Sequence, residues 1–356
     1  MTVNRAVALE GSNASYFTNG DDCHTGGVIC VTIEGRGVGL TLGKDLTQVS
    51  TILEIAASSR ARRQHQGVNM NKKSKSQQMK LKDGHTLGYA EYGSPEGEPV
   101  FYFHGFPSSR LDWQLSDPDD AAGALNARII APDRPGYGLS DFQRGRKLLD
   151  WPQDVLELAD GLGIDKFAVL GISGGGPYAA ACAYGLGDRL RKIGIVCGMG
   201  PAGAPGMKEG VSWTIPGYPG ILRIVILKLT AMGLQKDPDQ FLSKSKETMA
   251  ELDGQLLEQP ALAEMFIEGM REAFRGGTKG ANQEAGLYKR PWGFELQDIT
   301  GEVHLWHGEE DLNVPVSAGR FVAEAIPRCQ ANFYEGEGHL TLSYNHIREI
   351  LGALVG

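Results

Sequence analysis

Short apolar runs alternate with amphipathic stretches from residue 78 to the end of the chain. The apolar runs are typical of strands buried on both faces of a sheet, whereas the amphipathic stretches have the spacing of apolar positions found in helices. Strands are predicted at 100–103, 127–131, 167–173, 193–197, 303–306 and 331–334, and helices at 119–125, 148–162, 177–184, 316–326 and 342–355. Two further alternating segments within 79–93 are joined by Asp83-Gly84, which favours a β-hairpin. This alternation predicts a doubly wound α/β fold with a mostly parallel sheet.

Residues 200–298 interrupt the alternation between the sixth and seventh predicted strands, because they contain no strand pattern. Residues 221–229 are predicted to begin an apolar helix, and amphipathic helices are predicted at 237–257 and 260–274. We expect residues 201–298 to form a helical cap that shields the site and shapes an apolar pocket. Ordinary helix packing is favoured for most of its large apolar side chains (Met232, Met265, Phe266, Met270 and Phe274), and pocket walls are considered for Trp213, Tyr218, Trp292 and Phe294.

Residues 1–77 follow a different pattern. A hairpin is predicted from strands at 28–33 and 38–42, and a helix at 46–63. From residue 60 to residue 82 the chain carries eight Lys or Arg and no acid. A docking segment for anionic surfaces and a solvated linker both fit this run, and the linker is favoured. We therefore treat 1–77 as an N-terminal extension with a basic linker, expected to be partly disordered, ahead of a core formed by 78–200 and 299–356.

The net charge is −8 and the sequence pI is about 5.6, which argues against nucleic acid as the main partner. No apolar run is long enough to span a membrane, and the N-terminus lacks a secretory hydrophobic segment. The five cysteines are scattered without metal-ligand spacing. A reduced, cytoplasmic protein is expected, and the sequence leaves its oligomeric state open.

One predicted strand leads directly into a glycine-rich turn. Residues 171–175 read Gly-Ile-Ser-Gly-Gly and match Gly-x-Ser-x-Gly, with a small-residue helix behind them. In this context Ser173 occupies strained backbone on a sharp turn, whose neighbours must be nearly free of side chains. The hydroxyl then projects from the turn, and the N–H of Gly174 points to where an oxyanion would develop. A glycine-rich turn that binds phosphate, or only turns, is the alternative, and the partners of Ser173 decide between them.

Polar residues follow the other predicted strands, at the strand ends where ligands of α/β folds gather. The segments are His104-Gly-Phe-Pro107, Asp133-Arg-Pro-Gly-Tyr-Gly-Leu-Ser140, His307-Gly-Glu-Glu-Asp-Leu-Asn-Val-Pro315 and Glu335-Gly-Glu-Gly-His339. Together with the Ser173 turn, these motifs in this order resemble the α/β-hydrolase fold family over residues 78–356. The resemblance implies a nucleophile, an acid and a base in chain order, which Ser173, Asp311 and His339 satisfy. Glu309 and Glu310 compete with Asp311 as the acid, and the match to the family pattern favours Asp311.

The chemistry of these side chains supports the same roles. Serine is a poor nucleophile near neutral pH and needs a base, and the imidazole of His339 can accept and return a proton there. Asp311 would fix the histidine tautomer and stabilise the imidazolium. Backbone N–H groups of Phe106 and Gly174 are the candidates for the oxyanion hole, because Pro107 has no N–H to donate. The aspartate nucleophile of dehalogenases and epoxide hydrolases of this fold is absent, since the motif carries serine.

The sequence therefore predicts a carboxylesterase-like serine hydrolase that cleaves a small, mostly apolar carboxylic ester or related acyl compound through an acyl-enzyme. No metal or organic cofactor is needed for this chemistry. Thioester, amide and vinylogous C–C bonds are alternative targets of the same nucleophile. Two other functions stay open. One is a ligand receptor or regulatory protein that retains the triad with slow turnover, and the other is a lyase in which the same base acts without an acyl-enzyme.

Overall fold

The computed structural model describes residues 6–8, 14–18, 28–33, 36–41, 76–117 and 120–356. The chain forms two compact units, Met1–Met70 and Asn71–Gly356. In the first unit, β1 (Ala6–Ala8), β2 (Ala14–Thr18), β3 (Val28–Ile33) and β4 (Arg36–Thr41) form an antiparallel sheet in that order. The predicted hairpin is confirmed as β3 and β4, whereas β1 and β2 lie in a polar, turn-rich stretch that predicted no strand. The helix predicted at 46–63 and the basic linker as far as residue 75 lie outside the described residues.

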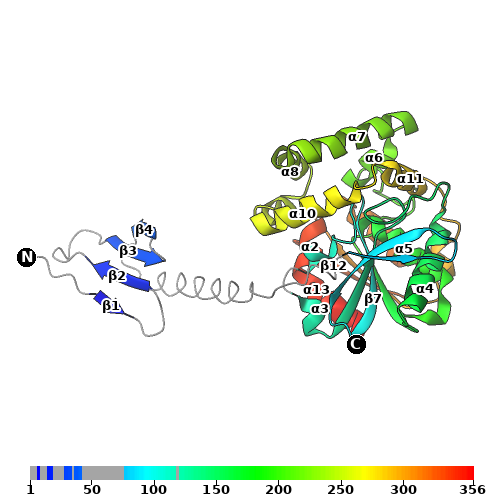
Figure 1. Cartoon of the computed structure of the whole chain (residues 1–356), viewed down its shortest axis with the longest axis horizontal. Coiled ribbons are helices and arrows are strands. Elements are labelled where there is room, and N and C mark those ends of the chain that lie inside the picture. Colours follow the sequence, from blue (N-terminus) through cyan, green and yellow to red (C-terminus); the bar gives the residue numbers. More distant parts are fainter. Residues whose placement is uncertain (1–5, 9–13, 19–27, 34–35, 42–75, 118–119) are drawn as a thin grey trace, which may run out of the picture. The chain divides into compact units, whose positions relative to one another are not determined.

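An eight-stranded sheet forms the centre of the second unit (Figure 1). Its strands are β5 (Gln77–Lys80), β6 (Thr86–Gly93), β7 (Glu98–Phe103), β8 (Ala127–Pro132), β9 (Phe167–Ile172), β10 (Leu190–Val196), β11 (Val303–Gly308) and β12 (Cys329–Tyr334). Their order is β12-β11-β10-β9-β7-β8-β6-β5. Strand β6 is antiparallel to both neighbours, and the remaining pairs are parallel. The mostly parallel sheet predicted from the sequence is confirmed.

Helices cover both faces of this sheet (Figure 1). One face carries α4 (Trp151–Gly161), α5 (Gly176–Gly185) and α12 (Val316–Ala325), and the other carries α3 (Ala121–Ala124) and α13 (His339–Val355). Alternate residues of β7 enter the two layers, because strand side chains point to opposite faces. Phe101 and Phe103 belong to the cluster with α4 and α5, and Val100 and Tyr102 to the cluster with α3 and α13. Full burial of such side chains stabilises the fold by about 1.5–3 kcal/mol each.

The chain between β10 and β11, the sixth and seventh strands of this sheet, is helical. It forms α6 (Thr214–Gly217), α7 (Gly220–Lys236), α8 (Pro238–Lys246), α9 (Glu251–Leu256), α10 (Pro260–Ala273) and α11 (Lys279–Tyr288). Figure 1 shows α7, α8 and α10 beyond one end of the sheet rather than on its faces. The action of this insertion as a cap stays a prediction, as do the domain boundaries at 77, 200 and 298. Among the described residues, none of the helices combines the length and apolarity needed to cross a bilayer.

The single helix predicted at 237–257 is wrong, because two helices, α8 and α9, occupy this stretch. The N–H groups of Thr248 and Met249 donate to carbonyls three residues earlier, at 3.2 and 3.3 Å, and form a turn after α8. Asp253 of α9 is hydrogen-bonded to the start of α13. These tertiary contacts outweigh the continuous helical pattern of the segment. Helix α11 had no counterpart in the predictions.

Most of the large apolar side chains that were expected to pack within the insertion do so, and Met232 of α7 does not. Met265, Phe266, Met270 and Phe274 pack in apolar clusters, but Met232 is 63% exposed. Helix α7 is apolar around most of its circumference, and only its Leu227 and Leu234 are buried. The protein interior therefore covers one side of this helix and leaves Met232 on the other. Of the candidate pocket walls, Trp213 and Trp292 are buried in the main core.

Candidate active site

The turn after β9 holds Ser173 in a left-handed backbone conformation, with φ of +54°. Residues other than glycine seldom adopt this conformation, and strained positions of this kind cluster at functional sites. Close contacts require the neighbouring glycines. A methyl group at Gly171 would overlap the carbonyl oxygen of Gly175, and one at Gly175 would overlap the carbonyl oxygen of Phe103. The strained turn thus depends on the small residues that its sequence motif contains.

The backbone of Gly174 lies beside the loop that follows β7. A β-carbon at Gly174 would be 2.6 Å from Cβ of Phe106 and 3.1 Å from the Phe106 backbone nitrogen. The hydroxyl of Tyr288 on α11 donates to the Gly174 carbonyl at 2.9 Å and helps to hold the turn. The N–H groups of Phe106 and Gly174 therefore belong to neighbouring backbone segments, and their role as oxyanion-hole donors stays a prediction.

The imidazole of His339 is hydrogen-bonded to Asp311. His339 is the first residue of α13, Asp311 lies in the loop after β11, and Nδ1 is 2.7 Å from Oδ2. Both side chains are buried. Burial raises the pKa of Asp311, but the charge and hydrogen bond of His339 bring it below the ordinary value, so Asp311 is ionised at neutral pH. A carboxylate only accepts hydrogen bonds, so Nδ1 carries the proton and Nε2 of neutral His339 is unprotonated, as its predicted role as a base requires.

Asp311 is held in place by its own loop. Its Oδ1 accepts hydrogen bonds from the N–H groups of Asn313 and Val314, each at 2.8 Å. The competing acids Glu309 and Glu310 are exposed, and Glu309 pairs with Arg320. In the described chain, Asp311 alone of these three acids is hydrogen-bonded to the imidazole.

Ser173 and His339 reach the same edge of the sheet, because β9, β10, β11 and β12 run parallel. Residues that follow β10 lie between them. The N–H of Met199 donates to the Ser173 carbonyl at 2.9 Å, and Sγ of Cys197 is 3.9 Å from the Gly338 carbonyl oxygen. Within the described residues, no hydrogen bond joins the Ser173 hydroxyl to His339. Hydrogen bonds between catalytic groups are often long before substrate binds, so Ser173 and His339 stay a predicted pair.

The protonation of His339 predicts how activity depends on pH. Burial lowers the pKa of His339, but the charge and hydrogen bond of Asp311, helped by Asp253 and Asp112, raise it above the ordinary value of 6.5. The base must be neutral, so kcat/KM should rise with pH through a midpoint above about 6.5. The measurement is the pH profile of kcat/KM on an uncharged ester. A midpoint well below 6.5 would contradict this assignment of the base.

Asp112, which lies outside the quoted sequence motifs, holds the loop after β7. Its Oδ2 accepts from the Gly105 N–H and the Tyr102 hydroxyl, each at 2.9 Å, and its Oδ1 accepts from the Ser108 hydroxyl at 2.8 Å. A β-carbon at Gly105 would lie 3.6 Å from Cβ of Ser173 and 3.7 Å from Asp112 Oδ2. Asp112 thus fixes the backbone beside Phe106 close to the Ser173 turn.

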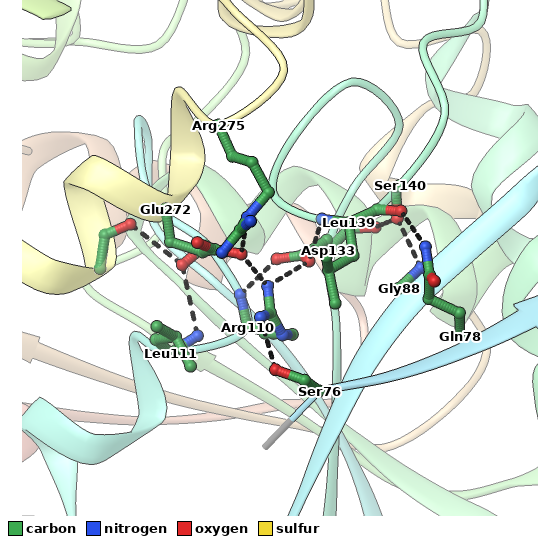
Figure 2. Close-up of polar contacts among 12 residues, drawn as sticks. Ser76, Gln78, Gly88, Arg110, Leu111, Asp133, Leu139, Ser140, Glu272 and Arg275 are labelled. Carbon is green, nitrogen blue, oxygen red and sulfur yellow. Dashed lines mark hydrogen bonds and ion pairs between the residues drawn. The ribbon is translucent and has the colours of Figure 1, made fainter. Parts of the chain in front are cut away.

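Buried ion pairs join the same loop to the helical insertion (Figure 2). Nη1 of Arg110 is 2.9 Å from Asp133 Oδ2 and 2.6 Å from Oε1 of Glu272 on α10. Arg275 also donates to Glu272, at 2.7 Å, and Ser76 accepts from Arg110 at 3.1 Å. Buried charges are costly to leave without partners, so these contacts hold α10 against the core.

Arg134 forms a second buried link between the loop and the insertion. Its Nε is 2.5 Å from Oε1 of Glu284 on α11, and Tyr137 donates to the same carboxylate at 2.6 Å. The guanidinium also donates to the backbone carbonyl of His104 and, at 3.0 Å, to that of Gly105. The loop that carries Phe106 is therefore fixed by two arginines whose carboxylate partners include residues of the insertion.

One buried set of described side chains has the spacing of metal ligands. Atoms of Cys197, His307 and Asp311 lie within 4.8 Å of one another. Nε2 of His307 contacts the Val314 carbonyl at 2.7 Å, and Asp311 accepts from His339. Nδ1 of His307, in contrast, faces Gly319 of α12 and has no hydrogen-bond partner among the described residues. We interpret this set as packing around Asp311 and assign no metal to it.

Comparisons with known proteins bear on this architecture. A family profile described as "Alpha/beta hydrolase family" matches residues 100–347. The 2-hydroxymuconate semialdehyde hydrolase of Pseudomonas putida is 26% identical over 257 residues, which cover 69% of this chain and 82% of that protein. The non-heme chloroperoxidase of Streptomyces lividans is 24% identical over 266 residues, which cover 73% of this chain and 92% of the relative. A solved esterase from Rhodococcus sp. ECU1013 has a TM-score of 0.58 at 22% identity, covering 78% of this chain and 96% of the esterase.

Proposed function

Because the chain belongs to the alpha/beta hydrolase family, we propose that it hydrolyses a small, mostly apolar carboxylic ester through an acyl-enzyme on Ser173. The observation that carries the proposal is the buried hydrogen bond between Asp311 and His339, at the sheet edge where β9 ends in the strained Ser173 turn. A small acyl compound is the proposed partner, and neither nucleic acid nor a cofactor takes part in the steps below. The three cysteines whose side chains the structure describes, Cys182, Cys197 and Cys329, are free. A cytoplasmic location stays a prediction.

Acylation begins when Oγ of Ser173 attacks the carbonyl carbon of the ester and its proton passes to Nε2 of His339. The imidazolium is stabilised by the ionised Asp311 at 2.7 Å. The carbonyl oxygen becomes an oxyanion, to which the N–H groups of Phe106 and Gly174 donate, each worth on the order of 3 kcal/mol. Collapse of the tetrahedral intermediate expels the alcohol, which takes the proton from Nε2.

Deacylation repeats these steps with water as the nucleophile. His339 takes a proton from water, the hydroxide adds to the acyl carbon, and the oxyanion forms against the same two N–H groups. Return of the proton to Oγ of Ser173 releases the carboxylic acid and restores the enzyme. The two buried arginine links keep the Phe106 loop in one position through both halves of the cycle.

A panel of p-nitrophenyl esters tests the proposal. The full-length protein should hydrolyse the acetate and butyrate esters, and acid quenching during turnover should trap an acyl group on Ser173. A folded protein that turns over no member of the panel would contradict the ester hydrolase proposal. 2-Hydroxymuconate semialdehyde, which is not an ester, should be assayed separately, because the relative from Pseudomonas putida is named for that substrate.

The two alternative functions give different results in the same assay. A receptor or regulatory protein would bind a ligand with little turnover. Pull-downs with and without residues 1–77 should then capture a protein partner only when these residues are present. A lyase would turn over its substrate with no acyl group on Ser173 after quenching. Both stay predictions from the sequence, and the family relationship favours the hydrolase.

A further inference from the structure

A carboxylate from the helical insertion lies at the first turn of the helix that carries His339. Asp253 belongs to α9 and is 1% exposed. Its Oδ2 accepts from the His339 N–H at 2.8 Å, and its Oδ1 accepts from the N–H groups of Leu340 and Thr341 at 2.8 and 2.9 Å. Three backbone donors at one helix end therefore share a single side chain from a distant part of the sequence.

The residue before His339 is shaped to admit this carboxylate. A β-carbon at Gly338 would lie 2.6 Å from Oδ1 of Asp253, closer than side-chain carbons approach an oxygen. The N–H of Gly338 donates to the hydroxyl of Thr341 at 2.8 Å instead. Glycine is required here by the close approach of Asp253, because the backbone conformation itself suits other residues.

These contacts fix the position of the imidazole through the backbone. The first N–H groups of a helix have no partner within the helix, and a carboxylate there also interacts favourably with the helix dipole. His339 is the first residue of α13, so the contact at its own N–H anchors its Cα. Asp311 holds Nδ1 from the other side, which leaves little freedom for Nε2.

We propose that Asp253 is a positioning residue for His339, and that α9 is a fixed part of the active site rather than part of a lid that opens. This inference rests on the proposed role of His339 as the catalytic base. Movement of α9 away from the core would strip three N–H groups of their acceptor and leave a buried carboxylate alone, which is costly. Substrate must then enter without displacement of α9.

The electrostatic setting of His339 gives a signature that packing alone would not produce. The charged and titratable groups around it are Asp311 after β11, Asp253 on α9, Asp112 beside α2 (Trp113–Ser116), and His307 on β11. The thiol of Cys197, after β10, also lies close, and burial raises its pKa well above the ordinary value, so it carries no charge here. The three carboxylates favour the imidazolium, and His307 is a buried histidine whose own pKa is lowered by burial. Loss of the charge of Asp253 should therefore make His339 easier to deprotonate.

The test compares Asp253→Asn with Asp237→Asn in the full-length chain. Asp237 is a matched control, because it caps α8 of the same insertion by accepting from the Gln240 N–H at 2.9 Å and is exposed. We expect Asp253→Asn to lower kcat/KM by roughly 10- to 100-fold with KM nearly unchanged, since displacement of a catalytic group acts mainly on the chemical step. The acid limb of the pH profile of kcat/KM should move to lower pH in Asp253→Asn. Asp237→Asn should keep the wild-type rate and profile.

A second readout does not depend on activity. NMR titration of the ring protons of His339, assigned by their loss in His339→Gln among the eight histidines, measures its pKa directly. The pKa should fall in Asp253→Asn and stay unchanged in Asp237→Asn. Should Asp253→Asn fail to fold, Gly338→Ala is the second variant, with Gly352→Ala as its control because a β-carbon at Gly352 meets no atom within 4 Å.

The outcomes separate the two proposals. If the Ser173→Ala variant hydrolyses esters as fast as the wild type, the proposed function is overturned. Ser173-dependent hydrolysis that Asp253→Asn leaves within two-fold, with an unchanged acid limb and His339 titration, would overturn the positioning role alone. An activity loss in Asp253→Asn without any shift of the titration would also contradict it, because lost stability by itself predicts that result.

Discussion

Replacing Ser173 with alanine is expected to lower kcat on p-nitrophenyl butyrate by roughly four to six orders of magnitude. Alanine cannot form the acyl-enzyme, and the remaining oxyanion donors and binding contacts supply only a small residual rate. The left-handed backbone at this position should tolerate alanine no worse than serine, so the fold should survive.

The control for this change is Ser317→Ala. The Ser317 hydroxyl donates to the Pro205 carbonyl at 3.1 Å and makes none of the contacts of the candidate site. The kcat of Ser317→Ala should match that of the wild type. Retention of more than about one hundredth of the wild-type kcat by Ser173→Ala would show that another group is the nucleophile.

Arg134→Ala is expected to lower the free energy of unfolding of the second unit by about 3–5 kcal/mol, because it leaves the buried Glu284 without its cationic partner. The guanidinium also holds two backbone carbonyls of the loop after β7 and lies 4.7 Å from the ring centre of Tyr178. The measurement is urea unfolding followed by tryptophan fluorescence. All five tryptophans lie in the second unit, so the signal reports that unit alone.

Arg191→Ala is the matched control for this stability prediction. Arg191 pairs with Glu98, and both side chains are more than two-fifths exposed. Exposed pairs contribute less than about 1 kcal/mol, because water and salt screen them. Equal unfolding midpoints for Arg134→Ala and the wild type would contradict the structural role of the Arg134–Glu284 pair.

The parts of the site that could be predicted from the sequence are those fixed by local patterns. Contacts within the strand–turn–helix require the glycines around Ser173, so the sequence motif is enough to predict the conformation of the turn. Asp311 and His339 each follow a strand of a parallel sheet, which brings them to one edge whatever the loops between them contain. The sheet itself could be predicted for the same reason, since strands buried on both faces have a simple apolar pattern.

The supporting roles of Asp253, Arg110 and Glu272 could not be predicted, because their partners are distant in the sequence. Asp253 bonds His339 across 86 positions, and Arg110 bonds Glu272 across 162. Neither acid differs in local sequence context from the exposed acids of the insertion. The break between α8 and α9 could not be predicted for a related reason. The apolar periodicity continues through this segment, whereas contacts with other elements determine where the helix ends.

The most direct test of the account is to identify the residue that a fluorophosphonate modifies. Peptide mass spectrometry of the treated full-length protein should find the phosphonyl group on Ser173, and His339→Gln should lose this labelling while remaining folded. An adduct on a different side chain, or equal labelling of Ser173 in His339→Gln and the wild type, would contradict a serine nucleophile activated by His339.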